Sequence, residues 1–195
     1  MSTVFFDIDS QIDFLYPAGA LYVPGAERIV PAIARLNGFA AGHGIPVVST
    51  TDAHGEDDPE FKVWPHHCVA GTLSQRKAEA TLLAQRVAIP NRECDLASIG
   101  GSQQIVVEKQ TVDVFLAPNL ARVVERLGAR DCVVYGVVTE ICVLYAVRGL
   151  LKMGRRVTVV TDAVETLKRQ DGERALAEMR AGGAKLAKAG EIYTA

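Results

Sequence analysis

The run VVYGVVTEICV (residues 133–143) decides the fold. Its first half is an apolar, β-branched segment typical of a buried strand, and its second half begins an amphipathic helix over 139–153 that ends at Gly154. A strand that passes directly into a helix is the repeating unit of a parallel sheet with helices on its faces. Cys142 lies at this junction, so we expect a thiol in the first turn of a helix, at the end of a strand.

The position of Cys142 predicts its reactivity. Backbone N–H groups at the start of a helix favour a thiolate, so we expect the pKa of Cys142 to fall from about 8.5 into or below the neutral range. An inert thiol buried on the core face of the helix is the commoner fate of a free cysteine. The first-turn position favours the reactive thiol over the inert one.

Strand and helix signals alternate along all 195 residues. Strands are predicted over 4–9, 45–50, 104–109, 132–136, 156–161 and, last, 185–188 or 191–194; helices are predicted over 26–42, weakly over 77–86, from Pro118 to Gly128, and over 139–153 and 168–181. Nearly continuous apolar strands predict an α/β fold, a six-stranded and mostly parallel sheet with helices on both faces in a Rossmann-like three-layer arrangement. No internal repeat or linker interrupts the pattern, which predicts a single domain over residues 1–195.

Composition narrows the class of protein. Hydrophobic residues make up 49% of the chain and charged residues 23%, which is typical of a globular protein. The formal net charge of −2, without a basic block, argues against nucleic acid as a partner. No apolar run approaches the roughly 20 residues that span a bilayer, and no signal-peptide pattern opens the chain. We therefore expect a cytoplasmic protein with reduced cysteines and no membrane partner.

Two other predicted strands end in charged residues. Asp7 and Asp9 close the first strand, and Lys109 closes the strand over 104–109. Because the carboxyl ends of parallel strands converge on one crevice, a carboxylate, an ammonium and the Cys142 thiol could meet there, which predicts a cysteine hydrolase. Strand alternation points Asp7 and Asp9 the same way, so either could be catalytic or could cap the following turn. Lys109 could equally be a solvated lysine just past the strand end.

A polar segment from Asp52 to about Gln75 is longer than a compact domain usually leaves unstructured, which predicts a functional loop. Its candidate metal ligands are Asp52, His54, Glu60 and one of the neighbours His66 and His67. This mixture of nitrogen and oxygen donors suits a divalent metal, zinc first, with iron or manganese as alternatives. An acidic loop with a few histidines can also be a solvated turn.

Together, these motifs resemble the isochorismatase-like cysteine hydrolases and, within them, the nicotinamidase branch. DSQIDF (9–14) is similar to the opening motif of the family and selects Asp9 over Asp7, and GALYVPGA (19–26) continues it. Lys109 falls where the lysine of the family ends the third strand, and GVVTEICV (136–143) resembles its nucleophile turn.

Two further motifs resemble the nicotinamidase metal loop. They are DAH (52–54) and WPHHCV (64–69), and the second selects His67 as the ligand and leaves His66 at the surface or behind the ligands. Two segments depart from the nicotinamidase pattern, QTVDVF (110–115) and LSQ (73–75). Both would line the pocket, so they bear on the substrate and leave the chemistry unchanged.

The resemblance implies an isochorismatase-like fold and a complete set of site residues. The implied set is a catalytic triad of Asp9, Lys109 and Cys142, a cis peptide between Val137 and Val138, an oxyanion hole of the Val138 and Cys142 N–H groups, metal ligands Asp52, His54, Glu60 and His67, and Phe14 and Trp64 on either side of a substrate ring. The implied metal binds the pyridine nitrogen of nicotinamide.

The function that follows is a metal-assisted cysteine amidohydrolase. It would cleave a small aromatic carboxamide such as nicotinamide to the acid and ammonia through a thioester, and relatives often assemble, so we expect a homo-oligomer. The alternatives are a metal-free family hydrolase acting on another small amide or a vinyl ether, and a catalytically silent scaffold for protein–protein contact. Disulfide exchange is a third alternative, but no resolving cysteine lies at a useful spacing.

Overall fold

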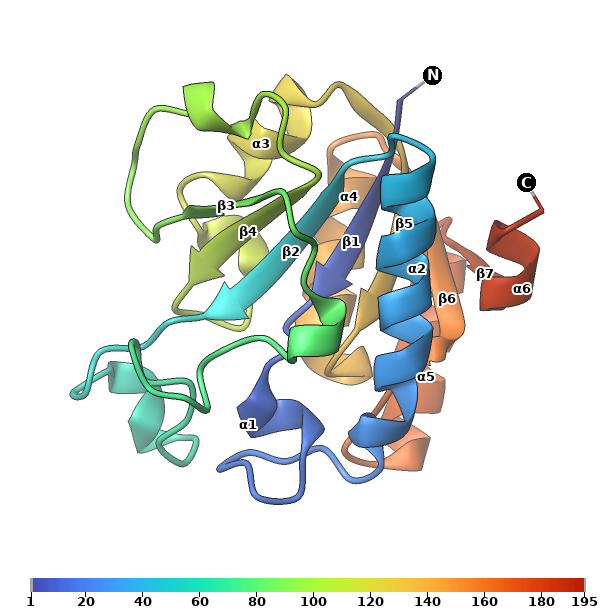
Figure 1. Ribbon diagram of the computed structural model, residues 1–195. Helices are drawn as coiled ribbons and strands as arrows, with labels where there is room; N and C mark the ends of the chain where they lie inside the picture. Colours follow the sequence, from blue (N-terminus) through green and yellow to red (C-terminus); the bar gives the residue numbers. More distant parts are fainter. Residues whose placement is uncertain (1, 195) are drawn as a thin grey trace.

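A parallel sheet organises residues 2–194, the part of the chain that the computed structural model describes (Figure 1). Its strands are β1 (Ser2–Ile8), β2 (Val47–Asp52), β3 (Arg86–Ile89), β4 (Gln104–Lys109), β5 (Ala129–Gly136), β6 (Arg156–Val164) and β7 (Lys185–Ala187). The seven strands lie in the order β3-β4-β2-β1-β5-β6-β7, and each neighbouring pair is parallel.

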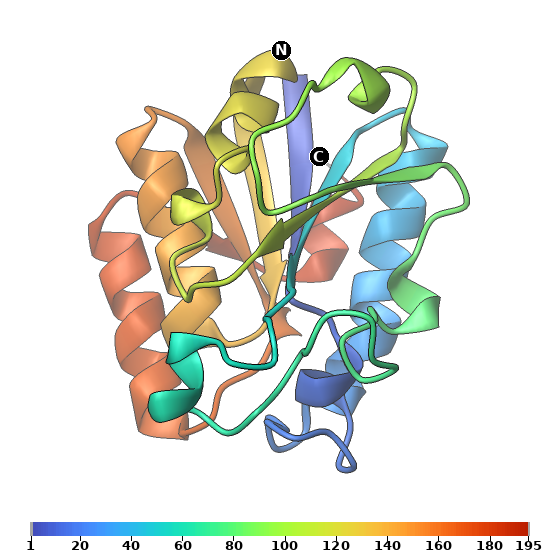
Figure 2. The same ribbon diagram turned by 90° about the vertical axis from the view of Figure 1, so that its left-hand side faces the viewer.

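Helices cover both faces of the sheet. They are α1 (Ile12–Leu15), α2 (Val30–Gly42), α3 (Leu120–Arg126), α4 (Leu144–Lys152), α5 (Arg169–Ala181) and α6 (Ala189–Ile192), with a π-helical turn η6 (Thr139–Val143) before α4 and 3-10 turns over 26–29, 59–62, 79–81, 97–99 and 114–116. Phe6 and Ile8 of β1 belong to the core that packs on α3, α4 and α5. Phe5 belongs to the core on the other face, under α1, α2 and α6. Figure 2 shows α4 and α5 on one side of the sheet and α2 on the other.

The α/β fold and the parallel sheet are confirmed, and the expected strand count is one too few. The missed strand is β3, which covers 86–89 at the edge of the sheet and carries an exposed arginine at its start. The weak helix predicted over 77–86 is wrong, because that segment contains only a 3-10 turn before β3 begins. The last strand is β7, and the alternative at 191–194 falls at the end of α6 and beyond it.

The strand order places a crevice beside β1. From β1 the chain moves to β2 on one side, and it later returns to β5 on the other side. Loops therefore leave the carboxyl ends of β1 and β5 in opposite directions, which opens a crevice where ligands bind in sheets of this kind. β4, β2, β1 and β5 are neighbours, and each carries a predicted site residue at its carboxyl end or just beyond.

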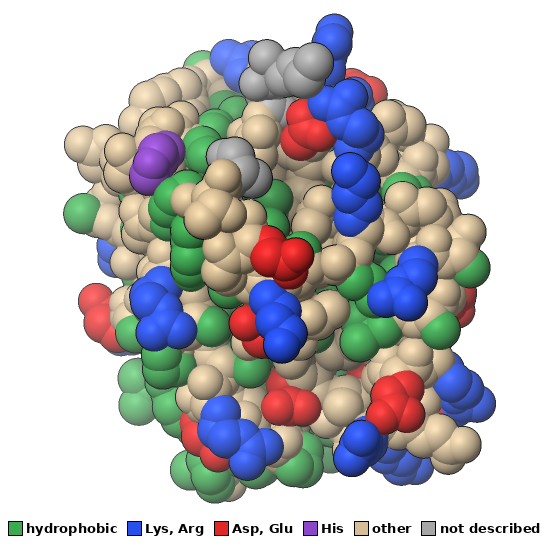
Figure 3. Space-filling view, turned by 90° about the vertical axis from the view of Figure 1, so that its right-hand side faces the viewer, with side chains coloured by type: hydrophobic (Ala, Val, Ile, Leu, Met, Phe, Trp, Pro, Cys, Tyr) green, Lys and Arg blue, Asp and Glu red, His purple; other side chains and the backbone are tan. Residues whose placement is uncertain are grey.

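The outer surface is mixed in charge where it can be seen. On the face drawn in Figure 3, basic and acidic side chains are interspersed, so that face presents no extended field of one sign. Within residues 2–194, no helix has the length and apolar character needed to cross a bilayer.

The end of β5 lies so close to β1 that position 136 requires glycine. Gly136 has a φ of +118°, and a Cβ at this position would lie 2.0 Å from the Ile8 carbonyl oxygen. The next N–H, that of Val137, donates to the same oxygen over 3.0 Å. The glycine thus lets β5 stay paired with β1 up to the point where the site begins.

We expect Gly136→Ala to lower the free energy of unfolding by about 2–5 kcal/mol, because it combines left-handed backbone strain with a clash against backbone that cannot move aside. Gly154→Ala is the matched control: its φ is +73° but nothing lies within 4 Å of the added Cβ. The control should lose only about 1 kcal/mol. Urea unfolding of both variants would measure this, and equal losses would contradict the clash.

Candidate active site

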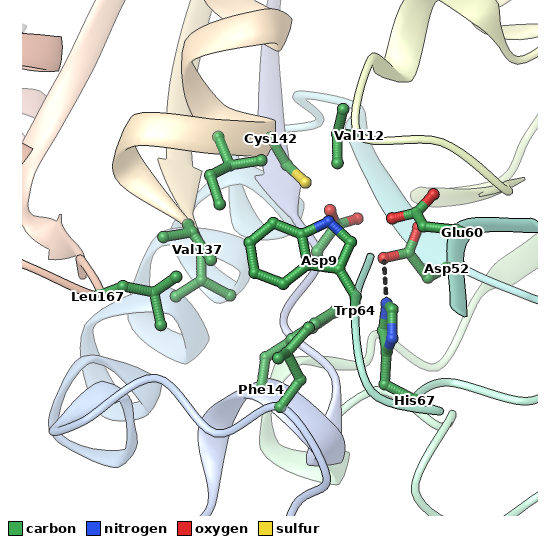
Figure 4. A pocket seen from close by; sticks show the side chains of 13 residues that line it. Asp9, Phe14, Asp52, Glu60, Trp64, His67, Val112, Val137, Cys142 and Leu167 are labelled. Atoms are coloured by element: carbon green, nitrogen blue, oxygen red, sulfur yellow. Dashed lines mark ion pairs between the residues drawn. The ribbon is translucent and has the colours of Figure 1, made fainter. Parts of the chain in front are cut away.

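Four neighbouring strand ends bring the predicted catalytic residues together. Asp9 follows β1 directly, Asp52 ends β2, Lys109 ends β4, and Cys142 lies in η6 just after β5. Asp52 and Lys109 are register partners on β2 and β4. Figure 4 shows the Cys142 thiol, the Asp9 carboxylate and the Trp64 indole directed into one pocket.

Lys109 is the centre of the catalytic group. Its Nζ lies 2.9 Å from Asp9 Oδ2 and 3.7 Å from Cys142 Sγ, and it also donates a hydrogen bond to Asp52 Oδ1. Only 1% of Lys109 is exposed, so it is not a solvated lysine past the strand end. The other oxygen of Asp9 accepts a 2.6 Å hydrogen bond from Thr50 Oγ1, which fixes the carboxylate. A carboxylate, an ammonium and a thiol thus meet in a buried site.

The environment of Cys142 reverses the expected direction of its pKa shift. Burial raises the pKa of Cys142 well above its ordinary value; the Lys109 ammonium opposes this, and the Asp9 and Asp52 carboxylates add to it. The expected fall in the pKa of Cys142 is therefore wrong in direction, because burial and two carboxylates act on the thiol. A thiol with a raised pKa holds its proton more tightly, so a reaction at this sulfur would need an adjacent base.

Lys109 itself keeps its charge. Burial lowers the pKa of Lys109, but Asp52 and Asp9 together outweigh burial and leave that pKa well above its ordinary value. The ammonium is therefore available to balance negative charge at the thiol and at both carboxylates.

Asp7 and Asp9 have separate partners on opposite faces of the sheet. The Ser49 hydroxyl donates to Asp7 Oδ2 over 3.4 Å, whereas the hydroxyl of Thr50, the next residue on β2, donates to Asp9. Adjacent strand residues face opposite sides of a sheet. Asp7 pairs instead with Lys77, whose Nζ lies 2.9 Å from Asp7 Oδ2. The expectation that both aspartates point the same way is wrong, because β1 ends at Ile8 and Asp9 has a left-handed φ of +48°.

Three of the predicted metal ligands form a buried cluster. Asp52, His54 and His67 each offer one ligand atom, and these atoms lie within 4.8 Å of one another. His54 Nε2 lies 3.9 Å from Asp52 Oδ1, and His67 Nε2 lies 4.0 Å from Asp52 Oδ2. Both imidazoles thus present the same ring nitrogen to one carboxylate.

The second ring nitrogen of each histidine is already occupied. His54 Nδ1 lies 3.0 Å from Asp58 Oδ2, and His67 Nδ1 lies 2.7 Å from the Pro65 carbonyl oxygen. These acceptors hold the proton on Nδ1 and leave a lone pair on Nε2, the arrangement of metal-ligating histidines. His54 Nε2 is buried and has no hydrogen-bond partner among residues 2–194. Burial also lowers the pKa of His67, which favours the neutral form that binds metal. The residues therefore fit a divalent metal.

Glu60 and His66 lie outside this cluster. Glu60 is half-buried and lines the same pocket, where burial and then the Asp52 carboxylate raise its pKa. His66 is exposed and stacks on Phe61 with ring centroids 4.2 Å apart, so it lies at the surface. Glu60 is thus near the three ligands without being grouped with them.

The rest of the pocket wall is apolar. It consists of Phe14, Leu21, Trp64, Val112, Val137, Val138, Ile141 and Leu167. The expected aromatic pair, Phe14 and Trp64, is present, and the Phe14 ring centroid lies 5.6 Å from that of His67. Of the two departing segments, 110–115 contributes Val112 to the lining, and 73–75 contributes no residue.

The nucleophile turn has the backbone that the motif implies. The peptide between Val137 and Val138 is cis. The Val138 N–H donates no backbone hydrogen bond within residues 2–194, so this donor is free beside Cys142 in the pocket wall.

Comparison with known proteins identifies the family. The family model described as the isochorismatase domain matches residues 3–191. The chain belongs to the isochorismatase family. It is 26% identical to the nicotinamidase of Escherichia coli (strain K12) over 92% of this chain and 91% of that protein.

Solved structures of isochorismatase relatives share this fold. The pyrazinamidase of Pyrococcus horikoshii in complex with zinc is 28% identical with a TM-score of 0.81, covering 96% of this chain and 99% of that chain. An isochorismatase-like hydrolase from Alkaliphilus metalliredigens is 21% identical with a TM-score of 0.85, covering 100% of this chain and 98% of that chain. The chain is therefore an isochorismatase-family hydrolase.

Several residues of the site were not singled out from the sequence. Thr50 holds Asp9, Asp58 holds His54, and Gln11 binds the backbone of Asp52 through its side chain. Thr50 gave a weak signal, as a polar residue at the end of an apolar strand. Asp58 lies four residues after His54 in an acidic loop, and no sequence pattern distinguishes it from the neighbouring acidic residues Glu56 and Asp57.

Two buried lysines pair with carboxylates, one in the site and one on the opposite face of the sheet: Lys109 with Asp9 and Asp52, and Lys77 with Asp7. We expect Lys109→Met and Lys77→Met each to lower the free energy of unfolding by about 3–5 kcal/mol, because each removes the ammonium that balances buried carboxylate charge. Only Lys109→Met should also slow alkylation of Cys142, roughly tenfold per unit by which the thiol pKa rises. Iodoacetamide labelling followed by peptide mass spectrometry would measure this. Equal slowing in both variants would contradict a specific effect of Lys109 on the thiol.

Proposed function

We propose that this isochorismatase-family hydrolase is a metal-assisted cysteine amidase that converts a small, neutral aromatic carboxamide to the acid and ammonia. Nicotinamide is the first substrate to test. The observation that carries the proposal is the position of Lys109 Nζ, which lies 3.7 Å from Cys142 Sγ, 2.9 Å from Asp9 Oδ2 and in contact with Asp52 of the metal cluster. A nucleophile, its base and a metal site therefore share one pocket. The similarity to a nicotinamidase and to a zinc-bound pyrazinamidase supports the same chemistry.

Acylation begins with the neutral thiol. Asp9 takes the Cys142 proton, and the Lys109 ammonium balances the charge of the thiolate. The sulfur attacks the amide carbon and the carbonyl oxygen becomes an oxyanion, which the Val138 and Cys142 N–H groups stabilise. Such a donor is typically worth about 10²–10³ in rate. The C–N bond then breaks, Asp9 returns the proton to the leaving nitrogen, and ammonia departs from a thioester on Cys142.

Deacylation uses the same base. Asp9 takes a proton from water as the water oxygen attacks the thioester carbon. The C–S bond breaks, the acid leaves, and the proton on Asp9 restores the Cys142 thiol. When bound, a divalent metal supplies an electrophilic centre that orients the substrate, and Asp52, His54 and His67 would hold it, with Glu60 beside them.

The apolar part of the pocket suits an aromatic ring. Phe14, Trp64 and the aliphatic side chains of the wall can hold an uncharged ring, while Asp52 and His67 line the side of the pocket that carries the metal cluster. This supports a small aromatic amide as the substrate.

Three broader parts of the hypothesis stay predictions. They are a single domain over residues 1–195, a homo-oligomeric assembly and a cytoplasmic location. The alternatives to the amidase are a metal-free hydrolase of another amide or a vinyl ether and a silent scaffold. Bound metal in the purified protein would distinguish the proposed amidase from a metal-free hydrolase. Turnover that is lost when the Cys142 thiol is removed would distinguish it from a silent scaffold.

Cys142→Ala should abolish ammonia release from nicotinamide, since no other group in the pocket can form the thioester. The matched control is Cys132→Ala, which removes a buried thiol from β5 outside the pocket lining and should keep turnover. A coupled ammonia assay would measure both variants. Activity of Cys142→Ala above about a tenth of wild type would refute the thioester mechanism. No release by the wild type would direct the search to other amides that suit the wall around Val112.

His54→Ala should lower the metal content of the purified protein and raise KM, because it removes one ligand of the cluster. His66→Ala is the control, since His66 is exposed and outside the cluster. Elemental analysis by inductively coupled plasma mass spectrometry would give the stoichiometry of both. Unchanged metal content in His54→Ala would remove this histidine, and with it the metal site, from the proposal.

A further inference from the structure

The turn that follows Asp9 is hydrogen-bonded to the metal loop at its entrance, just after its last ligand and at its exit. The loop begins at Asp52, carries its last ligand at His67 and returns to the sheet through 74–78. On the return side, backbone hydrogen bonds join Ile12 N to Arg76 O over 2.9 Å and Asp13 N to Ser74 O over 3.0 Å. The turn and the exit of the loop are therefore one backbone unit.

At the entrance of the loop, the Gln11 side chain binds the backbone of Asp52. Gln11 Nε2 donates to the Asp52 carbonyl oxygen over 2.9 Å, and Gln11 Oε1 accepts from the Asp52 N–H over 2.7 Å. Gln11 Nε2 also donates to the Gln75 carbonyl oxygen over 2.6 Å. One buried amide thus joins the first ligand of the loop to its exit.

The place of this amide explains why a glutamine is needed. β1 pairs with β2 only as far as Ile8 and Thr50, so Asp52 lies beyond the end of its neighbour on that side. A primary amide offers a donor and an acceptor, as a peptide group does. Gln11 therefore replaces the missing strand residue and extends the ladder of β2 to Asp52, which directs the carboxylate of Asp52 into the site.

Asp13 makes the corresponding contact in the middle of the loop. Its Oδ2 accepts from the Cys68 N–H over 2.6 Å, and its Oδ1 accepts from the Ala20 N–H over 2.8 Å. Cys68 follows His67 directly and has a left-handed φ of +46°, a conformation that needs such support. Asp13 is 2% exposed, so these hydrogen bonds are protected from water.

We propose that Gln11 and Asp13 are positioning residues that set the metal ligands Asp52 and His67 relative to the catalytic Asp9. Neither touches the thiol or offers an atom to the cluster; each acts through the backbone of a ligand or of its neighbour. The base and the metal site are thereby held by one segment of six residues, 9–14. This inference rests on the proposed function, because it requires that Asp52, His54 and His67 bind a divalent metal.

The test is Co²⁺ binding by Gln11→Met, with Gln104→Met as the matched control. Gln104 is also a fully buried glutamine with three hydrogen bonds, to Leu83 N, Ser49 Oγ and Thr81 O, but it contacts no residue of the cluster. We expect Gln11→Met to weaken Co²⁺ binding about 10–100-fold in a chelator competition and to shift the visible ligand-field spectrum. Gln104→Met should keep the wild-type affinity and spectrum, even if it lowers the melting temperature as much.

Each outcome decides the matter. A wild-type spectrum and Co²⁺ affinity in Gln11→Met would overturn the positioning role. An equal loss of Co²⁺ affinity in Gln104→Met would overturn it too, because the loss would then reflect lower stability in general. If Gln11→Met does not fold, the test uses Asp13→Asn. This substitution keeps the shape of the side chain but leaves either the Cys68 or the Ala20 N–H without an acceptor. Unchanged Co²⁺ binding in Asp13→Asn would equally overturn the positioning role. Absence of Co²⁺ binding by the wild type would overturn the proposed function and this inference together.

Discussion

The buried ammonium of Lys109 is the interaction on which the site depends. An unpaired charge in the interior costs several kcal/mol, so Lys109 can be buried only where carboxylates meet it. Asp9 and Asp52 do so from the ends of β1 and β2, while Lys109 comes from β4. The three strand ends must therefore stay in register for the charge to be balanced. This requirement joins the proposed catalytic residues to the candidate metal ligands, because Asp52 contacts Lys109 and also belongs to the cluster.

The raised pKa of Cys142 bears on how this thiol would react. Burial raises the pKa of this thiol, and Lys109 only partly opposes that effect. A raised pKa and burial both disfavour the exposed thiolate on which oxidation depends. In the proposed mechanism, the position of Asp9 beside Lys109 lets the ion pair receive the proton and balance the charge in one place.

The sequence predicted what depends on strand ends and could not predict what depends on three-dimensional contacts. Asp9, Lys109 and Cys142 meet because parallel strands bring their carboxyl ends together, which the strand pattern indicated, although only the family resemblance selected Asp9 over Asp7. The pKa of Cys142 depends on burial and on carboxylates from other strands, so the local pattern around it gave the wrong direction. The short strand β3 lacks the continuous apolar pattern of the other strands, and two of its four residues are exposed. The role of Gln11 depends on a contact with Asp52, 41 positions away in the sequence.

Asp7 on β1 and Asp9 just after it are both buried, but they have different partners. The Asp7 carboxylate binds Lys77 and Asn37 on the α2 face, and Lys77 also donates to Ser10 in the turn after Asp9. Lys77 lies at the exit of the metal loop, so the Lys77–Asp7 ion pair links that exit to β1 on the face of the sheet that α2 covers. The two aspartates thus pair with different lysines on opposite faces of the sheet, Asp9 in the proposed catalytic site and Asp7 outside it. The Lys77–Asp7 pair is useful even without a part in the chemistry. The segment after β2 carries His54 and His67, two of the three clustered ligands, and it has no strand or long helix to hold it in place.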